Sequence, residues 1–310
     1  MANGTNHFVS VADWSADELL RILERARELR RLYHAGERPQ TLQGRTLAMY
    51  LEKPSLRTHV TFEAGVTQMG GHAVVLRPDQ VGIGTRESPK DVARNLSRWV
   101  DGIMARTFSH SLVEQLAREA TVPVINGLTD LLHPCQVMSD LQTISEKMEP
   151  KDATVAYVGD GNNVANSLVL LASVLGLHLR VATPASHPPA VRVLQRAEKL
   201  ARESGARVTL TVDPAEAVRD AHFVYTDTWT SMGQEAEVEK RRKIFAAYQV
   251  NAELLKHAPD AWIMHCLPAH RGEEITDEIL DGPRSLVYEQ AENRLHSQKA
   301  IMERLMAPAF

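Results

Sequence analysis

The chain has 310 residues, of which 44% are hydrophobic and 24% are charged, and its formal net charge is −4. This length predicts two domains, because single hydrophobic cores stop growing beyond about 250–300 residues, and the lack of a basic excess argues against nucleic acid as a partner. The two cysteines, Cys135 and Cys266, are far apart, which argues against a disulfide framework and a structural zinc site.

The first half of the chain alternates between amphipathic and apolar segments. Ser15 and Glu18 form a capping box, which predicts a first helix through about Leu32. The segments that follow are a strand at 46–51, a helix at 55–69, a strand at 73–76, a helix at 89–100, a strand around Ile103, a helix at 111–120 and a strand at 122–125. Strands that alternate with helices predict a parallel sheet covered by helices.

The same alternation restarts at Ala153. It comprises strands at 155–158, 179–182, 208–212, 223–226 and 262–265, with helices at 164–175 and 190–203. A helix at 136–148 links the halves, and an amphipathic run at 289–305 ends the pattern.

These patterns predict an α/β fold with two α/β domains, each with a central, mainly parallel sheet flanked by helices, joined by interdomain helices. We place an N-terminal domain at 1–135, a linking helix at 136–150, a second domain at 151–288 and a C-terminal helix at 289–310 that packs back on the N-terminal domain. No segment is apolar over the roughly 18 residues that a membrane helix needs, and the first ten residues resemble no leader. We therefore expect a cytoplasmic protein that does not enter a membrane.

The segment Ser55-Leu56-Arg57-Thr58 lies where a predicted strand ends and a helix begins. Free backbone N–H groups and the positive end of the helix bind anions there, and the hydroxyl groups and the arginine add donors. This combination predicts a phosphate-binding site. A helix cap with a surface arginine is the competing interpretation, and it is a common one.

Two further segments are expected at the carboxyl ends of strands, where ligands bind in open α/β sheets. Arg106 follows the strand around Ile103, and His133 and Gln136 lie at the start of the linking helix. A single histidine is more often structural than functional, but the helix start and the neutral donor beside it favour a shared site with Arg57.

In the second half, a strand runs into the turn Gly159-Asp160-Gly161-Asn162-Asn163. The turn resembles the beginning of a dinucleotide fingerprint, but Val164 occupies the third glycine position, so a nicotinamide-dependent dehydrogenase is a weak alternative. Two asparagines at a helix start can instead hold the amino and carboxylate groups of an amino acid, although asparagine is also common in turns.

Asp227 ends another predicted strand, where a carboxylate can pair with a substrate ammonium, and the loop with Ser231 and Met232 follows it. Cys266 and Leu267 end the last predicted strand, directly after His265. Neighbouring residues on a strand point to opposite faces, which argues against a catalytic thiol–imidazole pair.

Taken together, these segments resemble the aspartate and ornithine carbamoyltransferase superfamily, and its ornithine branch in particular. The resemblance covers almost the whole chain and keeps the family order. Its motifs are Ser55-Leu56-Arg57-Thr58, Arg106, His133-Pro134-Cys135-Gln136, Asn163, Asp227, Ser231-Met232-Gly233, His265-Cys266-Leu267-Pro268 and Arg294.

The resemblance implies transfer of the carbamoyl group of carbamoyl phosphate to L-ornithine, giving citrulline and phosphate, in a homotrimer or a multiple of trimers. It implies that the catalytic residues are Arg57, Arg106, His133 and Cys266. The implied carbamoyl phosphate ligands are Ser55, Leu56, Arg57, Thr58, Arg106, His133, Gln136, Cys266, Leu267 and Arg294. The implied ornithine ligands are Asn163, Asp227, Ser231 and Met232. No metal and no cofactor are implied.

Three positions depart from the family pattern. Leu56 replaces a commoner threonine but keeps its backbone N–H, so phosphate binding should survive. His59 stands where arginine is usual, and Gly82 stands where many relatives carry a glutamine that reaches a neighbouring subunit's carbamoyl phosphate. We expect these departures to affect the contact across subunits rather than the main site.

Other interpretations remain open at this point. The same chemistry could act on putrescine, lysine or an N-acylated ornithine, while aspartate is disfavoured because its extra carboxylate would face Asp227 and Cys266. A non-catalytic relative is disfavoured because the charged and polar site residues are all present. The physiological direction, synthesis or phosphorolysis of citrulline, stays undecided because both directions use one site.

Overall fold

The computed structural model describes residues 7–230 and 237–307. These residues fall into two compact units, of which unit 1 comprises Met1–Gln142 with Glu292–Phe310 and unit 2 comprises Thr143–Ala291. The limits between the units fall inside α6 (Pro134–Ser145) and inside α13 (Val287–Met306). Within the described ranges, no helix combines the length and the apolar character that a membrane span requires.

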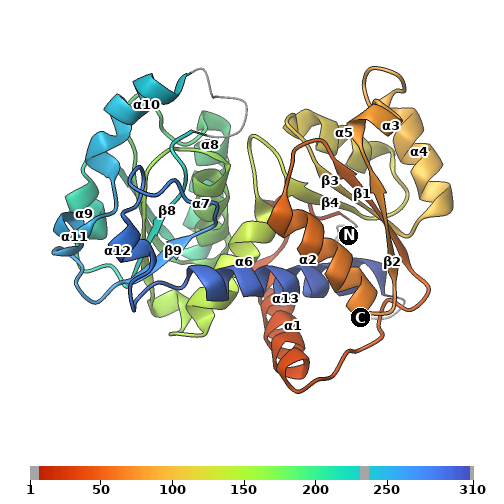
Figure 1. Cartoon of the computed structure of the whole chain (residues 1–310), viewed down its shortest axis with the longest axis horizontal. Coiled ribbons are helices and arrows are strands. Elements are labelled where there is room, and N and C mark those ends of the chain that lie inside the picture. Colours follow the sequence, from red (N-terminus) through yellow and green to blue (C-terminus); the bar gives the residue numbers. More distant parts are fainter. Residues whose placement is uncertain (1–6, 231–236, 308–310) are drawn as a thin grey trace. The chain divides into compact units, whose positions relative to one another are not determined.

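Unit 1 is built on a four-stranded sheet with the order β2-β1-β3-β4, and every neighbouring pair is parallel (Figure 1). Its strands are β1 (Thr46–Leu51), β2 (His72–Leu76), β3 (Gly102–Arg106) and β4 (Val124–Leu128). The connecting helices are α2 (Leu56–Gln68), α4 (Pro89–Trp99) and α5 (His110–Glu119). Parallel strands need such crossovers, which explains the alternation of the sequence.

The core of unit 1 lies along its central strands. Residues Leu47, Ala48, Met49 and Tyr50 of β1 are at most 2% exposed, whereas β2, at the edge of the sheet, is only partly buried. A strand buried on both faces has a continuous apolar run, as β1 does. Each fully buried leucine contributes roughly 1.5–3 kcal/mol to the stability of this core.

Helix α1 (Ala16–His34) begins at the predicted capping box. The Ser15 hydroxyl accepts from the Glu18 backbone N–H, and the Glu18 carboxylate accepts from the Ser15 backbone N–H. Within unit 1, α1 lies against α13 (Figure 1), where Arg25 donates to both carboxylate oxygens of the largely buried Glu303. This contact helps to place the C-terminal helix, which carries a site residue.

Unit 2 contains a five-stranded parallel sheet with the order β7-β6-β5-β8-β9 (Figure 1). Its strands are β5 (Thr154–Val158), β6 (His178–Ala182), β7 (Arg207–Thr211), β8 (Phe223–Thr226) and β9 (Trp262–His265). Its long helices are α7 (Asn163–Leu175) and α8 (Val191–Ser204). Helix α7 is buried on all sides from Val164 to Val174, as expected for a helix that is apolar all round.

Both sheets reverse their strand order once. In unit 1 the chain passes from β1 to one neighbour, β2, and then returns to the other neighbour, β3. In unit 2 the chain passes from β5 outward to β6 and β7 and then returns to β8, on the other side of β5. The crevice beyond the carboxyl ends of such strands is where open α/β sheets bind ligands. A ligand site is therefore expected at the loops after β1, β3, β5 and β8.

The structure confirms the predicted parallel α/β architecture and most of its elements, with two differences. Strand β4 spans Val124–Leu128 rather than 122–125, because Asn126 and Leu128 still pair with Ala105 and Arg106 of β3. The sequence prediction also missed the short helices α3 (Pro78–Val81), α9 (Pro214–Val218), α10 (Val238–Phe245), α11 (Ala252–Leu255) and α12 (Asp277–Leu280). Helices this short show too few turns to produce a periodic pattern.

Candidate active site

The loop after β1 leads into the predicted phosphate-binding segment. Ser55 is the N-cap of α2, and its hydroxyl accepts a hydrogen bond from the Thr58 backbone N–H at 3.1 Å. The first N–H groups of a helix have no partner within the helix, so this end presents donors and partial positive charge to an anion. The Leu56 side chain is 72% exposed, so only its backbone can serve this site.

The hydroxyl of Thr58 joins two arginines. Its Oγ1 accepts from Arg106 Nη1 and from Arg294 Nη2, each at 3.2 Å. Arg106 ends β3 and Arg294 lies on α13, and the two side chains are only 8% and 2% exposed. A hydroxyl that accepts two bonds still has a hydrogen to donate. The cluster therefore offers two cationic forks and one hydroxyl donor in a buried place, which suits a phosphate group.

Gln136 extends this cluster from the first turn of α6. Its Oε1 accepts from Arg294 Nη1 at 2.6 Å, and its Nε2 donates to Asp140 Oδ1 at 2.8 Å. Gln136 is 1% exposed. Both ends of the amide are thus held, which fixes its orientation beside the arginine.

His133 immediately precedes α6 and is also buried. Burial lowers the pKa of His133 well below its usual value, and the charges of Arg294, Arg106 and Arg57 lower it further. The imidazole is therefore neutral at neutral pH. A neutral imidazole can donate one hydrogen bond to a carbonyl oxygen without adding a positive charge to those of the arginines.

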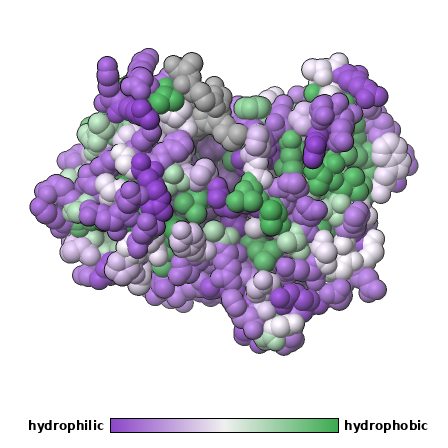
Figure 2. Space-filling view, in the orientation of Figure 1, coloured by the Kyte–Doolittle hydropathy of each residue, from purple (hydrophilic) through white to green (hydrophobic). Residues whose placement is uncertain are grey.

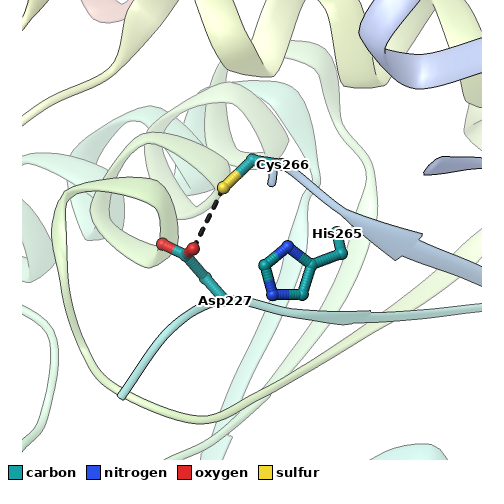
Figure 3. Close-up of side chains that lie close together, drawn as sticks. All are labelled: Asp227, His265 and Cys266. Atoms are coloured by element: carbon teal, nitrogen blue, oxygen red, sulfur yellow. Dashed lines mark hydrogen bonds between the residues drawn. The ribbon is translucent and has the colours of Figure 1, made fainter. Parts of the chain in front are cut away.

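The second group of candidate residues lies in unit 2, at the carboxyl ends of β5, β8 and β9. The Asp227 carboxylate accepts from Asn162 Nδ2 at 2.7 Å, from the Thr228 backbone N–H at 2.8 Å and from Cys266 Sγ at 3.0 Å. Figure 3 shows the Cys266 thiol directed at this carboxylate. Asp227 is 7% exposed, and these three donors engage both of its carboxylate oxygens.

His265 takes no part in a thiol–imidazole pair. Its Nδ1 accepts from the Leu267 backbone N–H at 2.8 Å, and its Nε2 lies 3.0 Å from Glu274 Oε1. The thiol of Cys266 instead faces Asp227 (Figure 3), so the two adjacent side chains bond to different partners. Although Asp227, His265 and Cys266 could by distance hold a metal ion, both ring nitrogens of His265 are already engaged.

The glycine turn after β5 is explained by packing rather than by a dinucleotide. A Cβ added at Gly161 would lie 2.2 Å from the Pro188 carbonyl carbon and 2.4 Å from Pro189 N. The backbone of the next crossover therefore requires glycine here. Asn162 caps α7, accepting from the N–H groups of Val164 and Ala165.

A family model described as the aspartate/ornithine carbamoyltransferase carbamoyl-P binding domain matches residues 6–146, and the model of the Asp/Orn binding domain of the same family matches residues 151–305. The chain belongs to the aspartate/ornithine carbamoyltransferase family.

Similar proteins cover nearly the full length of the chain. An ornithine carbamoyltransferase of Thermococcus kodakarensis is 51% identical over 296 residues, which are 95% of this chain and 94% of that protein. The solved structure of ornithine carbamoyltransferase from Pyrococcus furiosus has a TM-score of 0.94 at 49% identity and covers 97% of both chains. The Thermus thermophilus enzyme has a TM-score of 0.87 at 46% identity, covering 97% of this chain and 99% of that chain.

The residues predicted from the family motifs separate into two sets. Unit 1 brings together the set Ser55, Arg57, Thr58, Arg106, His133, Gln136 and Arg294. Unit 2 brings together Asp227, Cys266 and Leu267 through direct contacts and through His265. Asn163 is the first residue of α7, and its role in binding ornithine stays a prediction. Ser231 and Met232 lie outside the described residues.

The sequence pointed to both asparagines of the turn after β5, and of these Asn162 donates to Asp227. One residue with contacts to the family motifs was not predicted from the sequence. Gln298, one helical turn after Arg294, accepts from Arg294 Nη2 at 2.7 Å and donates to Thr61 Oγ1 at 2.6 Å when its amide is oriented to satisfy both neighbours. Gln298 follows Arg294 by four residues on an amphipathic helix, and side chains at this spacing are neighbours on the helix surface. This spacing could have predicted the contact.

The departures from the family pattern have simple local structures. His59 pairs with Glu63 one turn later on α2, with 3.0 Å between His59 Nε2 and Glu63 Oε2. Gly82 ends α3 with a φ of 62°, and an added Cβ would lie 2.8 Å from the Arg86 Cβ. Glycine thus suits the tight turn that follows α3.

Proposed function

We propose that this protein transfers the carbamoyl group of carbamoyl phosphate to the side-chain amine of L-ornithine, giving L-citrulline and phosphate. The observation that carries the proposal is the buried cluster in which Thr58 joins Arg106 to Arg294, which in turn holds Gln136. Thr58, Arg106 and Gln136 lie in the part of the chain that the carbamoyl-P binding model matches, and Arg294 lies on α13, in the part that the Asp/Orn binding model matches. Relatives that are 51% and 50% identical in sequence to this chain are named ornithine carbamoyltransferases.

Unit 1 would bind carbamoyl phosphate. The start of α2, with Ser55, Arg57 and Thr58, and the guanidinium group of Arg106 would hold the phosphate. As the bond to the carbamoyl carbon breaks, negative charge grows on the leaving phosphate. Donors that are already aimed at developing charge supply the largest catalytic contribution in many enzymes.

The carbamoyl group itself would be polarised by neutral donors. His133 is neutral because burial and three arginines lower its pKa, so it can donate to the carbonyl oxygen that becomes negative in the tetrahedral intermediate. The hydrogen of the Thr58 hydroxyl, and Arg106, are further donors for this oxygen. Gln136, held by Arg294 and Asp140, would address the carbamoyl NH₂.

Unit 2 would bind ornithine. Asp227 would pair with the α-ammonium group, with Asn163, Ser231 and Met232 as further ligands. Cys266 and the carbonyl of Leu267 would orient the reacting amine, which must lose its proton to attack because amines of this kind have a pKa of about 10.4. Attack on the carbamoyl carbon gives a tetrahedral intermediate, which expels phosphate; phosphate is itself a base that can take the proton.

We further propose that the protein is a cytoplasmic homotrimer or a multiple of trimers. The assembly is supported by apolar surface on α2 and β2, where Leu56, Val60 and Val74 are 72%, 53% and 39% exposed. Figure 2 shows apolar side chains gathered over the start of α2 and over β1 and β2. Surface of this kind commonly marks a protein interface. Sedimentation velocity at several concentrations tests this assembly, and a stable monomer would contradict it.

The function is tested by measuring citrulline formation from carbamoyl phosphate and ornithine, beside the ureido products of putrescine, lysine, N-acetylornithine and aspartate. We expect strong turnover with ornithine and a loss of about 10²–10³ in kcat for Arg57→Ala, the loss typical of removing one donor to a developing oxyanion. The control is Arg196→Ala on α8, a helix that carries none of the proposed ligands.

The alternatives make different predictions in the same assay. Turnover with another amine would keep the chemistry and change the substrate. If a folded protein forms no product with any of these amines, the assignment as an enzyme is rejected and a non-catalytic relative is favoured.

A further inference from the structure

Behind the Cys266-Leu267 turn lies a buried pair, His265 and Glu274. Both side chains are 0% exposed. His265 is the last residue of β9, and Glu274 lies in the loop that follows the turn. The Nε2 atom of His265 is 3.0 Å from Glu274 Oε1, and the same oxygen accepts from the His270 backbone N–H at 2.6 Å.

The hydrogen bonds determine the tautomer of His265. The Leu267 backbone N–H can only donate, so Nδ1, at 2.8 Å from it, carries no hydrogen. Nε2 faces a carboxylate and therefore carries the ring hydrogen. The imidazole thus connects a buried carboxylate on one side to the backbone of the turn on the other.

This connection holds the turn on both sides of Cys266. Before Cys266, the His265 backbone N–H donates to Gln290 Oε1 at 3.0 Å; after it, the Leu267 N–H donates to the His265 ring. Leu267 has a φ of 55°, in the left-handed region that non-glycine residues rarely adopt. A conformation of this kind persists only where the surroundings hold it, and the ring of His265 provides that contact.

We propose that His265 and Glu274 are positioning residues that hold the Cys266 thiol and the Leu267 carbonyl in place for the reacting amine of the substrate. The role rests on the proposed carbamoyl transfer. His265 acts through its Nδ1 on the turn, and Glu274 acts by orienting the ring and fixing its tautomer. The thiol then lies 3.0 Å from Asp227.

Two substitutions of His265 separate the two ring contacts. In His265→Asn, the amide oxygen can occupy the position of Nδ1 and accept from Leu267, but nothing reaches Glu274. In His265→Gln, the amide nitrogen can occupy the position of Nε2 and donate to Glu274, but the Leu267 N–H loses its acceptor. The two variants each remove one buried hydrogen bond, so a purely structural role predicts similar losses.

We expect His265→Gln to lower kcat/KM for ornithine about 10²-fold, the effect of a misplacement of about 1 Å in a reacting group, while KM for carbamoyl phosphate changes little. We expect His265→Asn to stay within about tenfold of wild type. Glu274→Gln, which keeps an oxygen for both donors, should fall between them and serves if the histidine variants fold poorly. The matched control is His222→Gln, which also removes a ring acceptor of a backbone N–H, that of Thr154, on an exposed part of unit 2.

A second readout does not depend on turnover. The alkylation rate of Cys266 by iodoacetamide, followed against pH, reports the placement of the thiol; Cys135 is 0% exposed and does not interfere. We expect the profile to shift in His265→Gln and to stay near wild type in His265→Asn. Equal changes in both variants, or none in either, would overturn the proposal. The wild-type protein could prove inactive while the pH profile of Cys266 alkylation still differs between the two variants. That result would reject the carbamoyl transfer but support the positioning role.

Discussion

Thr58 is the residue on which the proposed phosphate site depends most. Its hydroxyl oxygen accepts from the guanidinium groups of Arg106 and Arg294, and its backbone N–H is held by Ser55. These contacts join β3, α13 and the start of α2. One small side chain therefore sets the spacing of two cations that arrive from distant parts of the chain.

We predict that Thr58→Val weakens binding of carbamoyl phosphate. Valine has nearly the same shape but leaves two buried, charged donors without this acceptor, which costs about 1–3 kcal/mol. KM for carbamoyl phosphate should rise by roughly tenfold or more, since 1.4 kcal/mol corresponds to a factor of ten. Steady-state kinetics with each substrate varied in turn measure this. Thr58→Ser, which keeps the hydroxyl, should stay close to wild type, and an equal effect of both variants would contradict the role of the oxygen.

At the scale of elements, the proposed ligands gather where helices begin. Ser55 caps α2, His133 precedes α6, and Asn163 is the first residue of α7, after the cap Asn162. A helix start after a parallel strand presents N–H groups and positive potential at the carboxyl edge of the sheet. The cap of α7, Asn162, makes two kinds of contact. Its side-chain oxygen accepts from backbone N–H groups of the helix, and its side-chain nitrogen donates to Asp227.

We predict that Asn162→Asp keeps the helix cap but removes the hydrogen bond to Asp227. Aspartate is as good an N-cap as asparagine, so the helix should keep its stability, but the new carboxylate replaces a donor to Asp227 with a like charge. KM for ornithine should rise strongly while KM for carbamoyl phosphate stays the same. Asn162→Ala is the comparison, because it removes both contacts and should also lower unfolding stability by about 1 kcal/mol. An unchanged KM for ornithine in Asn162→Asp would show that Asn162 only caps the helix.

At the scale of the molecule, buried histidines should make stability depend on pH. Burial lowers the pKa of His133 well below its usual value and lowers that of His296, on α13, to about 4. In the unfolded chain a histidine titrates near about 6.5. Below that pH the unfolded chain binds protons that the folded protein does not, so this stability is fully present above about pH 6.5 and is lost as the pH falls.

We predict that the free energy of unfolding falls by up to about 1.4 kcal/mol per pH unit for each of these histidines on going from about pH 6 towards pH 4.5. Denaturant titrations at several pH values measure the slope. His296→Leu should lose its share of the slope, and an unchanged slope in this variant would contradict the assignment.

The sequence alone determined the alternation of strands and helices, because burial on both faces of a parallel strand and on one face of a helix leaves clear periodic patterns. It also pointed to the candidate site segments Ser55 to Thr58, Arg106 and His133, because strand ends and helix starts can be located from such patterns. The short helices left no such pattern and were missed.

The tertiary structure alone decided which of these residues touch. That Arg294 reaches Thr58 and Gln136, that Asn162 rather than Asn163 bonds to Asp227, and that His265 faces Glu274 and not the thiol all depend on contacts between side chains. Local patterns specify which face a residue occupies. They do not specify its partner, because the partner comes from another crossover whose position is set by the packing of the whole sheet.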